Sequence, residues 1–176
     1  MSKLRKMLGA VDSPYIISLM QLIETQSKAT IASWCIDYCE EYILPIFEKH
    51  CPGDNRPRMA INASRDWFEG KKKFLEVKNI ILNECHAAAR ELDDNPAAQA
   101  AARACGQVSA CFHTPTHSLG LAFYGAAAIA YDRVGLDETP EVYNRIAAEE
   151  CTKMETALRA VAVDNELNPA KIKWGY

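Results

Sequence analysis

Five helix-start signals divide this chain and constrain its fold more than any other feature. Each is a capping side chain followed, at once or within three residues, by a proline. A capping oxygen accepts a hydrogen bond from the first turn, and proline at the first helical position loses no backbone bond. The signals are Ser13-Pro14, Asp54-Asn55-Arg56-Pro57, Asn95-Pro96, Thr114-Pro115 and Thr139-Pro140. Gly53, Gly70 and Gly135 are candidate helix ends.

Between these signals, apolar residues recur with the period of an α-helix. The pattern predicts helices over residues 14–27, 28–50, 56–69, 71–92, 96–112, 115–134 and 140–163, with an irregular tail from residue 168. Pro45 should kink or split the second helix, because proline removes a hydrogen bond inside it. Residues 115–134 are apolar nearly all round, which makes them the candidate central helix. No useful length of sequence alternates apolar and polar residues, so no sheet is expected.

The predicted fold class is all-α: a compact bundle of about seven helices, mostly antiparallel because the connecting loops are short. The chain has 176 residues, which suits one domain over residues 1–176, with the helix over 140–163 packed on the rest. It contains 26 alanines, and alanine is the best helix former. Their concentration over residues 87–130 would let neighbouring backbones approach closely around the few polar side chains there.

The charge balance and the cysteines indicate a cytoplasmic protein. Lysine and arginine number 20 and aspartate and glutamate 23, and this net charge of −3 argues against nucleic acid as a partner. The longest apolar run, residues 119–131, is too short to span a membrane. Seven cysteines, no C-x-x-C pair and no secretory signal indicate reduced thiols. Cys35 and Cys39 lie beside an apolar stripe and are expected in the core.

Three histidines in the alanine-rich middle could carry chemistry. His113 and His117 are four residues apart, but Pro115 places His117 in the first turn of a new helix, where the dipole disfavours a charged imidazole. A neutral His117 could accept a hydrogen bond or bind a metal. Two interpretations stay open. Either His86, His113 and His117 converge on a polar or metal-binding pocket, or they bond to backbone carbonyls at helix ends and fix the packing.

Arginines supply further candidates. Arg90 and Arg103 lie in apolar helices, so each is expected to have an acidic partner or a cluster of carbonyls. With them, the polar core candidates are His86, Arg90, Arg103, His113, His117 and Tyr124. A second set could bind a protein partner, since Arg and Trp anchor interfaces, or could only cap a helix and pair with Asp54 and Asp66. Its members are Asp54, Arg56, Arg58, Arg65 and Trp67.

Several short segments, taken in order over about residues 19–131, carry a resemblance to one family. They are Ile23-Glu24-x-Gln26, Trp34, Leu44-Pro45-x-Phe47-Glu48, Asp54-x-Arg56-Pro57-Arg58-x-Ala60-Ile61, Trp67, Gly70, His86-Ala-Ala-Ala-Arg90, Ala100-Ala-Ala-Arg103-Ala, His113-x-x-x-His117 and Tyr124-Gly-Ala-Ala. As a set they resemble bacterial immunity proteins with an Imm-5-like domain. The resemblance implies a small cytosolic helical protein that binds and neutralises a partner toxin. It implies no catalytic residue.

Two functions remain as alternatives. The first is an immunity protein that occludes a toxin, is not an enzyme and needs no cofactor; its acidic pI of about 5.8 would suit a basic toxin surface. The absence of P-loop, G-x-G-x-x-G, G-x-S-x-G and H-E-x-x-H motifs favours it. The second is a helical protein that binds a divalent transition metal or a small ligand, and could be a hydrolase or transferase, through His86, His113 and His117. A homo-oligomer is compatible with either.

Overall fold

Helices account for nearly all regular structure in the computed structural model, which describes residues 3–175. The α-helices are α1 (Pro14–Ile23), α2 (Lys28–Tyr38), α3 (Leu44–His50), α4 (Arg56–Phe68), α5 (Phe74–Ile80), α6 (His86–Arg90), α7 (Pro96–Ser109), α8 (Ser118–Val134) and α9 (Pro140–Val161). Two π turns, Cys39–Ile43 and Ile81–Cys85, join α2 to α3 and α5 to α6, and a 3-10 turn, Pro115–His117, leads into α8. When joined helices count as one, residues 3–175 form seven helices and no strand, which confirms the predicted fold class.

Proline marks the helix starts as predicted. It stands at the first or second position of α1, α4, α7, the 3-10 turn and α9. The cap hydrogen bonds are less uniform. The side chains of Asn95 and Thr139 accept from backbone N–H groups of the first turn, whereas those of Ser13 and Thr114 make no cap bond. The shared determinant of these starts is therefore the proline.

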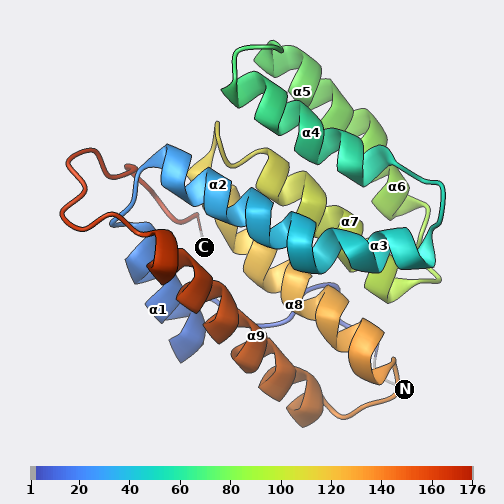
Figure 1. The fold of residues 1–176 in the computed structure, drawn as a ribbon. Coiled ribbons are helices and arrows are strands. Elements are labelled where there is room, and N and C mark those ends of the chain that lie inside the picture. The colour runs from blue at the N-terminus through green and yellow to red at the C-terminus, as the bar shows by residue number, and fades with distance from the viewer. Residues whose placement is uncertain (1–2, 176) are drawn as a thin grey trace.

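Pro45 splits its helix into two segments without turning the chain. The N–H of Leu44 donates to the carbonyl of Cys39, five residues back, which closes a π turn just before the proline. The wider turn accommodates the proline without a change in chain direction, so α2 and α3 lie end to end (Figure 1).

Several predicted boundaries were wrong, among them the end of the helix predicted over residues 96–112, which ends at Ser109. The first helix ends at Ile23 rather than residue 27. The helix predicted from residue 71 begins at Phe74, because Lys71 and Lys72 lie in the preceding loop and pair with Glu69 and Asp66. The irregular tail starts directly after Val161.

The centre of the fold is the pair α7 and α8, which form the most extensive helix–helix contact in the described chain. Nearly all of α8 from Ser118 to Tyr131 is buried, as expected for a central helix. Small residues keep the pair close: a Cβ built on Gly120 would lie 2.4 Å from Cβ of Gln107. The α4–α5–α6 layer and the α2–α3 rod cover α7, while α9 and α1 lie on the other side of the bundle (Figure 1).

An N-terminal arm, residues 3–13, lies along α8 before α1 begins. Leu8 is fully buried, and its N–H donates to the carbonyl of Phe123 at 3.1 Å. The hydroxyl of Tyr131 donates to the carbonyl of Arg5. These bonds fix the arm beside α7 and α8, where it forms one wall of several clefts.

No described helix is long and apolar enough to cross a membrane.

Candidate functional site

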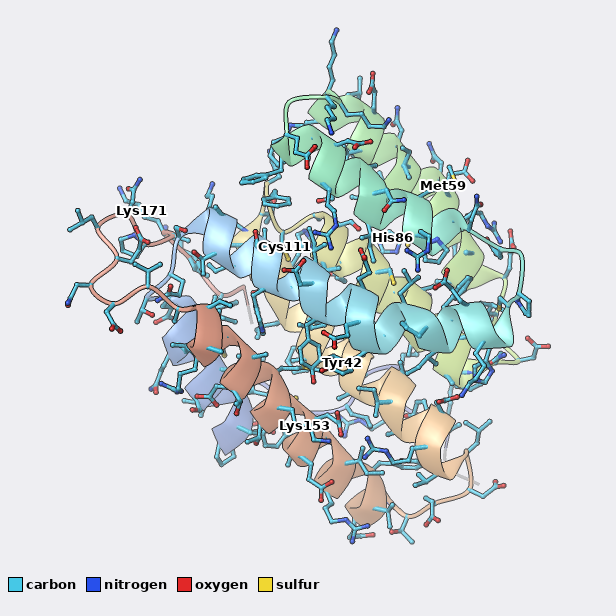
Figure 2. The ribbon with its side chains drawn as sticks, viewed as in Figure 1. Tyr42, Met59, His86, Cys111, Lys153 and Lys171 are labelled. Atoms are coloured by element: carbon cyan, nitrogen blue, oxygen red, sulfur yellow. The ribbon has the colours of Figure 1, made fainter. Side chains whose placement is uncertain are left out.

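The three histidines line a single cavity, which we call the histidine cavity. Its volume is about 300 Å³, and its wall includes Phe74 and Gln107. His86 is the first residue of α6, directly after a π turn, and Figure 2 labels it beneath α4, where α4, α6 and α7 meet. His113 lies in the loop after α7, and His117 ends the 3-10 turn that leads into α8.

Two of the histidines are held by side chains. The ring of His113 stacks on Phe74, with centroids 4.0 Å apart and planes 16° from parallel, and its Nδ1 lies 3.0 Å from the hydroxyl of Thr114. Nδ1 of His117 lies 2.7 Å from Oε1 of Gln107. Since a carbonyl oxygen only accepts, Nδ1 carries the proton, and Nε2 of the neutral ring is an acceptor. No hydrogen bond from either ring to a backbone carbonyl is found in the described chain.

His86 is placed by a glycine. A Cβ built on Gly106 would lie 2.5 Å from Cε1 and 2.9 Å from Nδ1 of His86, so only glycine lets this ring lie against α7. Nδ1 of His86 is buried and has no hydrogen-bond partner among residues 3–175. A buried polar atom without a partner costs free energy and invites a ligand that would satisfy it.

Two of the three imidazoles in the histidine cavity, those of His86 and His117, are shifted toward the neutral form. Burial lowers the pKa of His86, and the nearby positive charges of Arg103 and Arg90 lower it further. Burial and His113 lower the pKa of His117. The described residues contain no group of three or more His, Cys, Asp or Glu side chains placed to hold a metal ion. The unpartnered Nδ1 of His86 and the acceptor Nε2 of His117 are suited to hydrogen bonding with a small ligand.

These shifts predict a stability that falls on mild acidification. Because the pKa values of His86 and His117 are lowered on folding, the unfolded chain binds more protons below about pH 6.5, the ordinary histidine pKa. We expect the free energy of unfolding to drop as the pH falls from about 7.5 to 5.5, before the carboxylates titrate. Urea unfolding at several pH values measures this, and His86→Gln with His117→Gln should flatten the profile. An equally steep profile in the double variant would contradict the assignment.

The proposed partner-binding arginines are paired within the molecule. Arg56 contacts both Asp54, at 2.8 Å, and Glu91, at 2.7 Å. Arg58 binds Glu48 through two hydrogen bonds of 2.7 and 2.9 Å. These two ion pairs link the start of α4 to the end of α6 and to α3, which favours the helix-capping interpretation over a free binding site.

The other members of that set sit near the far end of α4. Arg65 lies 3.1 Å from Asp37 and 3.0 Å from Glu40. Trp67 packs against Phe74 and Phe112, with ring centroids 5.5 and 6.1 Å apart. Asp66 pairs with Lys72 rather than with an arginine of this set.

Arg90 and Arg103 differ from the partnered arginines. Neither has an ion pair or hydrogen bond among the described residues, so the expected acidic partner or carbonyl cluster is missing. Nε of Arg103 is buried without a partner, while Arg90 is exposed. Tyr124, the remaining polar candidate, lines a separate cleft with Gln107 and Gly120 beside the N-terminal arm.

Six of the seven cysteines are buried and Cys51 is partly buried; Cys35 and Cys39 are fully buried, as predicted. Sγ of Cys39 lies 3.7 Å from Sγ of Cys105 across the contact between the α2–α3 rod and α7. Burial, with the neighbouring Cys111 that Figure 2 labels, raises the pKa of the Cys35 thiol. These thiols pack in the interior of the bundle.

Sequence reasoning missed Gly106, Gln107 and Phe74, which shape the histidine cavity. A signal for Gly106 was present: it lies inside α7, after the alanine-rich part of that helix, where glycine costs helix stability and so implies a close contact. Nothing in the sequence indicates the partners of Gln107 and Phe74, because each contact joins a helix to another segment of the chain.

The helices, the paired arginines and the histidine cavity define an all-helical protein with a small cavity at the ends of α5, α7 and α8. The chain belongs to the Imm-5 like family, described as "Imm-5 like putative immunity protein", whose model matches residues 21–157. This span confirms the predicted resemblance and extends it through most of α9. No curated protein and no solved structure matches the chain.

Proposed function

We propose that this protein binds and neutralises a partner toxin in the cytoplasm. The observation that carries the proposal is membership of an immunity-protein family over residues 21–157, which includes all of α2 to α8. The internally paired arginines of α4 are compatible with this role, since a protein that acts by occlusion needs a rigid surface and no catalytic group.

The surface that we expect the toxin to contact lies on the hairpin of α4 and α5. Phe68 is 55% exposed and Leu75 65% exposed. The ring of Phe68 stacks on Phe112 with centroids 4.3 Å apart, so it is held in place while facing solvent. Rigid exposed aromatic side chains are typical anchors of protein interfaces. Trp67, a predicted partner-binding residue, would support this surface from beneath.

The test is co-expression with a toxin gene adjacent to the gene for this protein. The wild-type protein should restore growth and co-purify with the toxin. Phe68→Ser should weaken toxin binding at least about tenfold, as loss of an interface anchor does. Val161→Ser, at a 54% exposed position on α9, should leave binding unchanged. Failure to rescue growth and to co-purify would overturn the proposal.

A second candidate function is favoured by the histidine cavity, where three imidazoles and a buried unpartnered Nδ1 of His86 share one space. We infer a small organic ligand rather than a metal, and a hydrolase or transferase reaction would be built on the same residues. Protein purified without a histidine tag should contain no stoichiometric Zn, Ni, Mn or Fe by elemental analysis. Phenol, added as a small aromatic hydrogen-bonding probe, should shift the ring-nitrogen resonances of His86 and His117; unmoved resonances would exclude a ligand site there.

A further inference from the structure

A second cleft, which we call the Arg103 cleft, lies between the N-terminal arm, the first half of α7 and the loop after α8. Its volume is about 660 Å³. Four cationic side chains line it against two carboxylates: Lys3, Arg5, Lys6 and Arg103, with Asp93 and Asp137. The cleft is therefore electropositive in a protein whose net charge is −3.

Arg103 differs from the other cations of this lining because it has a buried donor atom without a partner in the described chain. Arg56, Arg58, Arg65 and Arg133 each contact a carboxylate within 3.1 Å, but Arg103 has no such partner among residues 3–175. Its Nε is buried and makes no hydrogen bond. Arg103 as a whole is only partly buried, but a buried N–H donor without a partner costs free energy, and an anion in the cleft would remove this cost by accepting a hydrogen bond from it.

The two carboxylates that line the cleft do not pair with Arg103. One oxygen of Asp93 accepts a hydrogen bond from Nε2 of Gln99 at 3.0 Å, which turns it toward α7. Asp137 lies in the loop after α8 and forms no ion pair with Arg103. The four cationic side chains exceed the two carboxylates by two positive charges. A phosphate monoester carries nearly two negative charges at neutral pH and would balance them.

We propose that the Arg103 cleft binds the phosphate group of a small phosphorylated molecule. The guanidinium of Arg103 binds the phosphate oxygens through paired N–H donors, and Arg5 and Lys6 close over the anion from the arm. Apolar side chains on the other walls, Leu4, Tyr131 and Leu136, contact the organic part. The volume lies in the range of ordinary small-molecule sites. This site is independent of the toxin-binding proposal, because it uses neither Phe68 nor the α4–α5 hairpin.

His86 provides a reporter inside the protein. Arg103 lies one helical turn before Gly106, against which the His86 ring packs, and its charge is one of the causes that lower the pKa of His86. An anion bound to Arg103 compensates that charge. Phosphate binding should therefore raise the pKa of His86, and Arg103→Met should raise it without any ligand.

The experiment is calorimetric and NMR titration of the full chain with inorganic phosphate, adenosine monophosphate and adenosine. We expect the two phosphates to bind and to raise the pKa of His86, and adenosine not to bind. Tighter binding of the monophosphate identifies an ester, whereas equal affinities identify free phosphate as the ligand. Arg103→Met should weaken binding at least about tenfold, consistent with loss of a paired charge-assisted contact.

Two further variants test phosphate binding if Arg103→Met folds poorly. Arg5→Gln with Lys6→Gln changes only exposed side chains of the arm and should also weaken phosphate binding several-fold. Arg159→Gln removes a positive charge from α9, where Arg159 pairs with Glu155 outside the cleft, and should have no effect. Absence of phosphate binding by the wild type, equal binding by adenosine, or unchanged binding in both cleft variants would overturn the proposal.

Discussion

Replacing Gly120 by alanine is expected to destabilise the protein by about 2–3 kcal/mol, the usual cost of overpacking a core. The new Cβ would lie 2.4 Å from Cβ and 2.5 Å from Cγ of Gln107. A Cβ atom is fixed to its backbone, so a rotamer change cannot relieve the clash and α7 and α8 must move apart. This contact is the most extensive in the fold. Urea unfolding followed by circular dichroism measures the loss, and the displaced Gln107 should release its bond to His117.

Gly125→Ala is the matched control on the same helix. There the new Cβ would meet only the ends of two flexible side chains, Cδ1 of Ile43 and Cε of Met154, both at 3.3 Å. Small rotations relieve these contacts, and alanine is favoured over glycine in a helix by about 1 kcal/mol. The control should therefore be within about 1 kcal/mol of the wild type. Equal destabilisation by the two variants would show that helix flexibility, rather than the close approach at Gln107, sets the cost.

The sequence was a good guide to helices because local chemistry determines where they begin. The prolines after Ser13, Asn95, Thr114 and Thr139 mark starts that the structure reproduces. Ends were less predictable. The predicted start at residue 71 was wrong, because Lys71 and Lys72 lie in the loop before Phe74. They pair with Glu69 and Asp66, and this pairing depends on how the loop folds.

The candidate site was predictable in composition but not in geometry. Their shared place in the alanine-rich middle of the chain marked His86, His113 and His117 as a set, and they do line one cavity. Their different environments could not be predicted, because each depends on a residue from another segment: Gly106 for His86, Phe74 for His113. Pairing of Arg56 with Glu91 spans 35 residues and has no local signal. By the same reasoning, the absence of a partner for Arg103 is visible only in three dimensions.

The second large effect is expected from Leu8→Ala, which should destabilise the protein by about 3 kcal/mol, as removal of a buried leucine does. Leu8 is only 1% exposed and is the fully buried anchor of the N-terminal arm. Its N–H bond to Phe123 is retained in the variant, so the loss reports side-chain burial. The arm lies before residue 21, where the family match begins, and thus adds stability to the shared helical core. Thermal and urea unfolding measure the effect.

Met7→Ala is the appropriate control, because Met7 is the neighbouring residue but 42% exposed. It should cost less than about 1 kcal/mol, as substitutions near the surface usually do. The same pair of variants separates stability from ligand binding, since Arg5 and Lys6 reach the Arg103 cleft only while Leu8 holds the arm against α8. Leu8→Ala should weaken phosphate binding under conditions where the protein is still folded, and Met7→Ala should not. A folded Leu8→Ala protein with wild-type phosphate affinity would show that the arm contributes stability alone and that Arg103 binds its anion without it.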